Sequence, residues 1–216
     1  MAAQTNAKAR LVEAAERLFA RRGIDAVSLA EITAEAGLRN TGAVHYYFGG
    51  REQLLEAIVE SHRAEVDRRR EELLDGLEAA GETNYPALVR ALIEPLVDKL
   101  DDERGRDFLS IQAQRHLRPR PIAGPASRRP LALRLVAMVG TPDLGGPVAQ
   151  LVSEFGLLLT YGALAQRALI EGGESGRGSG LDRDDFVDQL VAAVVRVQSE
   201  GAAPRPRSRR QAGTRS

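Results

Sequence analysis

The chain has 216 residues, of which 43% are hydrophobic, so it is long enough and apolar enough to bury a sizeable core. Thirty basic residues balance 30 acidic ones, and the lack of cysteine excludes a disulfide framework, a thiolate metal site and a cysteine nucleophile. The start of the chain has no apolar signal core, and the longest uncharged apolar run, residues 155–166, is too short to span a bilayer, so we expect a cytoplasmic protein without a membrane partner.

The first predicted helix begins near Ala7 and ends at the basic pair and glycine of residues 21–23. Its apolar positions follow the three-four spacing of one buried face: Leu11, Ala14, Leu18 and Phe19. A second helix is predicted from Leu29, because Ser28 and Glu31 have the spacing of a capping box. This helix is short, since Gly37 follows as a residue that tolerates the positive φ of a helix end.

A third helix is predicted to run to Phe48, with Thr41 as its cap, after a turn over residues 38–40. Two short helices joined by a turn that contains glycine form a helix-turn-helix. The third helix carries His45, Tyr46 and Tyr47 in succession. Successive helical residues point about 100° apart, so three polar-tipped rings in a row do not all face a core. One or two of the rings are expected inside, Phe48 first, and the others suit base edges and phosphates.

These motifs occur in a fixed order: an N-terminal helix that ends in LFARRG, the capped helix, AG, the turn, an aromatic helix that ends in YF, and a basic residue followed by E-x-L. This order resembles the TetR/AcrR family of transcriptional repressors over about residues 7–55, roughly a quarter of the chain. The resemblance implies that His45 takes the place of a tyrosine that contacts DNA, and Arg51 that of a lysine that contacts phosphate. The turn is one residue longer than in the common pattern. The full set of expected DNA-contacting residues is Ser28, Arg39, Asn40, Thr41, His45, Tyr46, Tyr47 and Arg51.

A long helix is predicted over residues 51–80. A helix that begins in one domain and continues into the next can transmit movement between them. Its charge-rich middle, RAEVDRRREEL, has the alternating signs of a solvated face, an interpretation we favour over a DNA-binding run. An amphipathic helix over residues 85–100, kinked at Pro95, and another over residues 104–117 follow. Polar groups on an apolar face suit a ligand pocket. For each of these groups taken separately, a polar residue at the edge of the core is at least as good an explanation. The expected ligand-binding residues are Phe108, Gln112, Arg115, His116 and Tyr161.

Residues 118–130 are rich in proline and arginine and are predicted as a loop, followed by a helix over residues 130–139. The helix that begins at Pro147 has no charged residue between Glu154 and Arg167, and a helix that is apolar all round needs to be buried all round. One subunit of this size covers only part of it, so we expect a homodimer built from this helix and the last one, over residues 182–199. The expected interface residues are Phe155, Leu158, Gly162, Leu190 and Val194.

The predicted fold is all-α, with a three-helix helix-turn-helix domain over residues 1–50, a larger helical ligand-binding and dimerisation domain over residues 51–200, and a disordered basic tail over residues 201–216. The predicted function is a ligand-responsive transcriptional regulator, a repressor that binds a palindromic operator in double-stranded DNA and is released by a small hydrophobic molecule. The alternative is a helical DNA-binding protein without a ligand. No cofactor, metal or catalytic residue is expected: the chain has no Glu-x-x-His pair for a di-iron centre, and its three histidines are widely separated.

Overall fold

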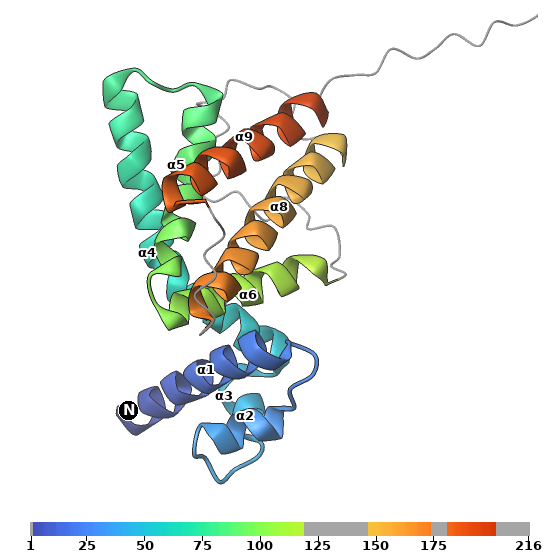
Figure 1. Cartoon of the computed structure of the whole chain (residues 1–216). Helices are drawn as coiled ribbons and strands as arrows, with labels where there is room; N and C mark the ends of the chain where they lie inside the picture. The colour runs from blue at the N-terminus through green and yellow to red at the C-terminus, as the bar shows by residue number, and fades with distance from the viewer. Residues whose placement is uncertain (1, 119–146, 174–180, 202–216) are drawn as a thin grey trace, which may run out of the picture.

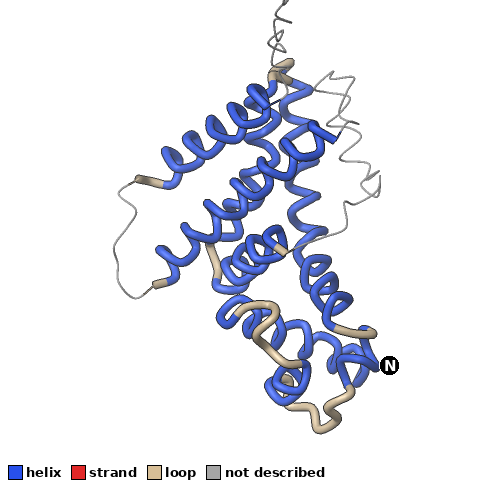
Figure 2. The backbone as a smooth tube through the Cα atoms, turned by 90° about the vertical axis from the view of Figure 1, so that its right-hand side faces the viewer, coloured by secondary structure: helices blue, strands red, loops and turns tan. Residues whose placement is uncertain are grey.

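The computed structural model describes residues 2–118, 147–173 and 181–201, and every regular element within these ranges is a helix (Figure 2). A group at one end of the molecule consists of α1 (Ala2–Arg22), α2 (Leu29–Glu35) and α3 (Ala43–Phe48) (Figure 1). α4 (Arg51–Ala80) begins there and continues into a second group, which contains α5 (Tyr85–Val97), the 3-10 turn η1 (Asp98–Leu100), α6 (Glu103–Leu117), α8 (Pro147–Gly172) and α9 (Arg183–Gly201). The predicted all-α fold is therefore confirmed.

Short polar side chains set the starts of several helices. The side chain of Asn84 accepts a hydrogen bond from the backbone N–H of Ala87 at 3.1 Å, which fixes the start of α5. Asp102 accepts from the N–H of Gly105 at 2.7 Å, so α6 starts one residue before the predicted position. The predicted helix over residues 85–100 ends instead in a 3-10 turn. The predicted helix over residues 130–139 and the tail from residue 202 lie outside the described residues.

The first group closes around its own small core. α1, the loop after it, α2, α3 and the first turns of α4 contribute buried side chains: Leu11, Phe19, Ile24, Ile32, Val44, Leu54, Leu55 and Ile58. Ile111 of α6 is buried in the same cluster, so the core of the helix-turn-helix is completed by a residue from the second group. This shared residue joins the two groups through apolar packing as well as through the continuous α4.

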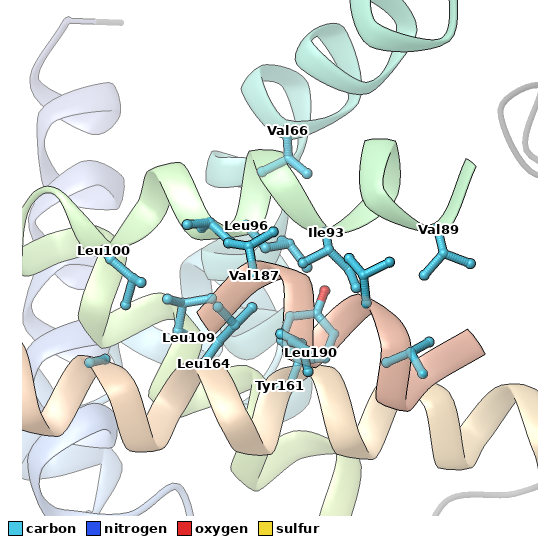
Figure 3. Close-up of a cluster of buried hydrophobic side chains, with 14 of the residues drawn as sticks. Val66, Val89, Ile93, Leu96, Leu100, Leu109, Tyr161, Leu164, Val187 and Leu190 are labelled. Carbon is cyan, nitrogen blue, oxygen red and sulfur yellow. The ribbon is translucent and has the colours of Figure 1, made fainter. Parts of the chain in front are cut away.

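A larger cluster forms the core of the second group (Figure 3). It is built from Val66 of α4, the apolar face of α5, and residues of α6, α8 and α9 such as Leu109, Leu164 and Leu190. α6 packs across α8, and α8 lies beside α9 (Figure 1). Along the outside of α4, Arg63 pairs with Glu56 and Glu60, and Arg68 pairs with Glu72. The charge-rich middle of α4 thus forms ion pairs within the helix, and Glu65 and Arg69 pair with Lys99 and Asp98 of η1.

Candidate nucleic-acid interface and ligand cluster

The capping box of α2 forms as the sequence predicts. Glu31 N–H donates to Ser28 Oγ at 3.2 Å, and Glu31 Oε2 accepts from the backbone N–H of Ser28 at 2.8 Å. Hydrogen bonds from the Ser28 backbone, the Ser28 hydroxyl and Arg22 lower the pKa of Glu31 to about 2. Ser28 is exposed, but its hydroxyl is engaged by Glu31, so its expected contact with DNA stays a prediction.

The turn before α3 is held by Asn40, and this corrects the predicted cap. Asn40 Oδ1 accepts from the N–H of Gly42 at 2.9 Å, and Asn40 O accepts from the N–H of Ala43 at 3.0 Å. Gly42 is the N-cap residue of α3, and no side chain caps the helix, so Thr41 is not a cap. α3 therefore starts one position later than a cap at Thr41 predicts. Arg39 and Thr41 are both exposed in this turn.

α3 turns its small apolar residues inward and its polar-tipped rings outward. Ala43 and Val44 are buried, while His45 is exposed and the side chain of Tyr46 is 72% exposed. Tyr47 is half-buried and packs edge to face against Tyr46, with ring centroids 4.9 Å apart. Gly49 takes φ 90° and ends the helix. The short helix therefore presents a surface of ring edges and hydroxyls, supported from behind by Val44.

Arg51 lies against α1 rather than at the outer face of α3. Its guanidinium donates to the carbonyl oxygen of Ile24 and stands 5.7 Å from the ring centroid of Phe19. These contacts connect α4 with the end of α1. The contact of Arg51 with a DNA phosphate stays a prediction, and Phe48, expected to be the most deeply buried ring of α3, is only half-buried.

Four of the five predicted ligand-binding residues come together between α6 and α8. Phe108, Gln112 and Tyr161 are buried, and Gln112 Nε2 donates to Tyr161 Oη at 3.3 Å. The ring of His116 stacks on that of Tyr161, with centroids 4.9 Å apart. Arg115, on the same helix face, pairs with Glu56 of α4, and its expected contact with a ligand stays a prediction.

α6 also contacts the helix-turn-helix through residues that sequence reasoning missed. Gln114 Nε2 donates to Phe19 O at 3.2 Å, and Gln114 Oε1 accepts from the N–H of Ile24 at 2.9 Å. Gln114 points away from the predicted apolar face of α6, so the pattern gave no signal for it.

A buried polar cluster joins α1, α4 and α6. Glu16 is 1% exposed, its carboxylate contacts His62 Nε2, and it accepts from Arg104 Nε at 2.8 Å. The signal was present in the sequence: Glu16 is a charged residue three positions before the buried Phe19, on a helix face that is otherwise apolar.

The predicted interface residues divide into two sets. Phe155 is 48% exposed, Gly162 is exposed and Leu158 is half-buried, so α8 leaves part of its apolar surface uncovered. Leu190 and Val194 are 5% and 4% exposed, because they belong to the core that α9 makes with α5 and α8. The chain itself thus buries both side chains, and their expected place in a dimer interface stays a prediction.

No helix in the described ranges is long and apolar enough to cross a membrane. Within residues 2–118, 147–173 and 181–201, histidine and acidic side chains form no group of three or more that suits a metal ion.

Residues 11–58 match the sequence profile of the bacterial regulatory proteins of the tetR family. Two proteins of Pseudomonas putida, the HTH-type transcriptional regulator TtgR and the probable HTH-type transcriptional regulator ArpR, are each 37% identical to this chain over 54 residues. That match spans a quarter of this chain and a quarter of each relative. Among solved structures, RolR in complex with resorcinol is similar in fold, with a TM-score of 0.50, 24% sequence identity, and coverage of 94% of this chain and 96% of RolR.

Proposed function

From the premise that this chain belongs to the TetR family of transcriptional regulators, we propose that it is a homodimeric repressor that binds a palindromic operator and is released by a small hydrophobic molecule. The observation that carries this proposal is the exposed ring surface of α3, with Tyr46 72% exposed at its centre. A helix of this kind, placed on α2 within a rigid three-helix unit, suits entry into the major groove. The proposed domains are residues 1–50 and 51–200, with α4 starting at the boundary.

The proposed dimer places two copies of α3 on one side of the DNA. A two-fold axis gives both copies the same orientation relative to their half-sites, which lie about 34–36 Å apart, one turn of the DNA helix, or a multiple of it. The exposed apolar residues of α8, such as Phe155 and Leu157, support an interface there.

The proposed effector binds in the cluster between α6 and α8. The ligand of RolR, resorcinol, supports a small organic molecule as effector for a chain of this fold. α6 stands between the cluster and the helix-turn-helix: Gln112 contacts Tyr161 of α8, while Gln114 holds Phe19 and Ile24. A ligand that binds more tightly when α6 has one of two placements shifts the equilibrium between the two corresponding conformations of the helix-turn-helix. A ligand that binds both placements equally does not shift this equilibrium.

The test is a DNase I footprint of the full-length protein on the DNA immediately upstream of its own coding sequence. We expect two protected half-sites related by inverted symmetry, with centres about 10 base pairs or a multiple apart. The footprint should survive an excess of unrelated competitor DNA, because base contacts add to the salt-dependent attraction of phosphates. Loss of DNA protection in the presence of competitor, or a single protected site without symmetry, would refute the proposal that the protein binds an operator as a dimer.

A further inference from the structure

Two glutamines on α6 have different surroundings. Gln114 uses both halves of its amide, since its Nε2 donates to Phe19 O and its Oε1 accepts from Ile24 N–H. Gln112 is 5% exposed and uses only one half: Nε2 donates to Tyr161 Oη, and the buried Oε1 has no hydrogen-bond partner among the described residues. A buried carbonyl oxygen without a donor costs free energy, and most such oxygens in proteins are paired. Gln112 Oε1 therefore marks a place where a donor is needed.

Aromatic rings flank this oxygen along α6. Phe108, one helical turn before Gln112, stacks on His62 of α4 with ring centroids 4.4 Å apart. His116, one turn after Gln112, stacks on Tyr161 of α8. Residues four apart lie on the same face of a helix, so the acceptor stands between two ring pairs. A flat apolar ligand that carries one donor suits these surroundings.

We propose that Gln112 Oε1 accepts a hydrogen bond from the hydroxyl group of an aromatic effector, which places the effector in the phenol class. This inference rests on the proposed function, because it names the chemistry of the effector proposed there. A carboxylate has no proton to donate when ionised, and a charged group of either sign is costly to bury without a partner. A neutral ring hydroxyl donates the required hydrogen bond and keeps the rest of the molecule apolar.

The test measures binding of three fluorinated probes to the full-length protein by ¹⁹F NMR titration without DNA. 4-Fluorophenol donates a hydrogen bond, 4-fluoroanisole only accepts one at the same position, and 4-fluorotoluene does neither. We expect 4-fluorophenol to bind about tenfold more tightly than the other two, the effect of one buried hydrogen bond. Gln112→Leu should remove this preference, while the matched control Gln114→Leu, on the opposite side of α6, should keep it.

Equal affinity for the three probes, a preference that survives Gln112→Leu, or no binding of 4-fluorophenol would overturn the inference. If Gln112→Leu does not fold, the comparison of 4-fluorophenol with 4-fluoroanisole in the unsubstituted protein decides the question alone. The outcome is separable from the regulator proposal. A missing operator footprint would refute that proposal and leave the phenol preference measurable, whereas equal probe affinities would refute this inference and leave the footprint standing.

Discussion

Tyr46 is the side chain that α3 exposes most, and it faces away from the core that Val44 enters. A large ring held on a short, well-packed helix loses little conformational freedom when it contacts DNA. A substitution at Tyr46 is therefore expected to change DNA binding and to leave the core of the domain intact.

We predict that Tyr46→Ala weakens operator binding by about tenfold or more, since a single recognition contact is worth roughly 1–3 kcal/mol. A gel-shift titration at fixed salt measures the loss, and the thermal unfolding midpoint should stay unchanged. Tyr85→Phe is the control. Tyr85 donates to Gln198 Oε1 in the second group, so removing its hydroxyl affects a hydrogen bond there and not the affinity for DNA. Undiminished binding by Tyr46→Ala would remove α3 as the recognition helix.

Asp107 on α6 gives a prediction about pH. Burial raises the pKa of Asp107 to about 6, above its ordinary value of 3.8. The folded protein therefore holds this proton more tightly than the unfolded chain, and the resulting stability is present below about pH 4 and is lost as the pH rises through 6. We predict that Asp107→Asn raises the thermal unfolding midpoint at pH 8 and leaves it unchanged at pH 4. Because Asp107 is only half-buried, solvent screening keeps the gain small, and a gain that is equal at both pH values would contradict the assignment.

The sequence predicted individual residues best where a local pattern decides their position. The capping box of Ser28 and Glu31 needs only neighbours in the chain, and it forms as expected. Thr41 failed as a cap because Asn40, one residue earlier, satisfies Gly42 and displaces the helix start. Leu190 lies on an apolar helix, but whether the chain itself or a partner covers it depends on where α5 packs. Such tertiary placement is not encoded in helical periodicity.

At the scale of elements, α1, α4 and α6 meet at a buried carboxylate. Glu16 of α1 contacts His62 of α4 and accepts from Arg104 of α6, whose Nη2 also donates to Ser61 Oγ at 3.0 Å. The hydrogen bond with Glu16 raises the pKa of Arg104. One residue of the first helix thus connects to both helices that lead into the second group.

We predict that Glu16→Ala destabilises the fold by about 3 kcal/mol, because it leaves His62 buried without its carboxylate partner and removes one of the two acceptors of Arg104. Urea unfolding followed by circular dichroism measures the change. Glu13→Ala is the control, since Glu13 is exposed on the same helix and its removal should cost below about 0.5 kcal/mol. Equal effects of the two substitutions would show that the contacts of Glu16 with His62 and Arg104 contribute nothing to stability.

Helix boundaries were predictable where capping residues or glycines mark them, as at Asn84 and Gly81, whereas α6, capped by Asp102, starts one residue before the predicted position. The division of the helix after Pro95 was not predictable, because a 3-10 turn of three residues has the same apolar spacing as the helix that it ends. The role of α6 was only half predictable. Its apolar face indicated the second core, but Ile111 on that face packs in the core of the first group. Gln114, which also contacts the first group, lies outside that face.

For the whole molecule, the uncovered apolar surface of α8 decides the proposed assembly. Phe155 and Leu157 are 48% and 43% exposed on a helix whose other face is buried against α6 and α9. Gly156 lies between them, and its missing side chain admits Gln198 of α9, so a substituent there would meet Gln198 Nε2 at 2.6 Å. α8 and α9 thus form one continuous surface side by side (Figure 1), the geometry from which two copies build a four-helix interface.

We predict that Phe155→Arg prevents the proposed dimerisation and leaves a folded monomer that does not bind the proposed operator at nanomolar concentration. Half of the Phe155 side chain is exposed in the single chain, so the charge disturbs the partner contact far more than the core. In an isologous interface the same residue enters twice, and two buried charges of one sign oppose each other across the axis. Light scattering measures the mass and circular dichroism the fold, with Leu117→Arg as the control because Leu117 is 76% exposed on a different helix, α6. A Phe155→Arg protein that remains dimeric would place the interface on another surface, and a monomer that still protects both half-sites would show that the single chain reads the operator by itself.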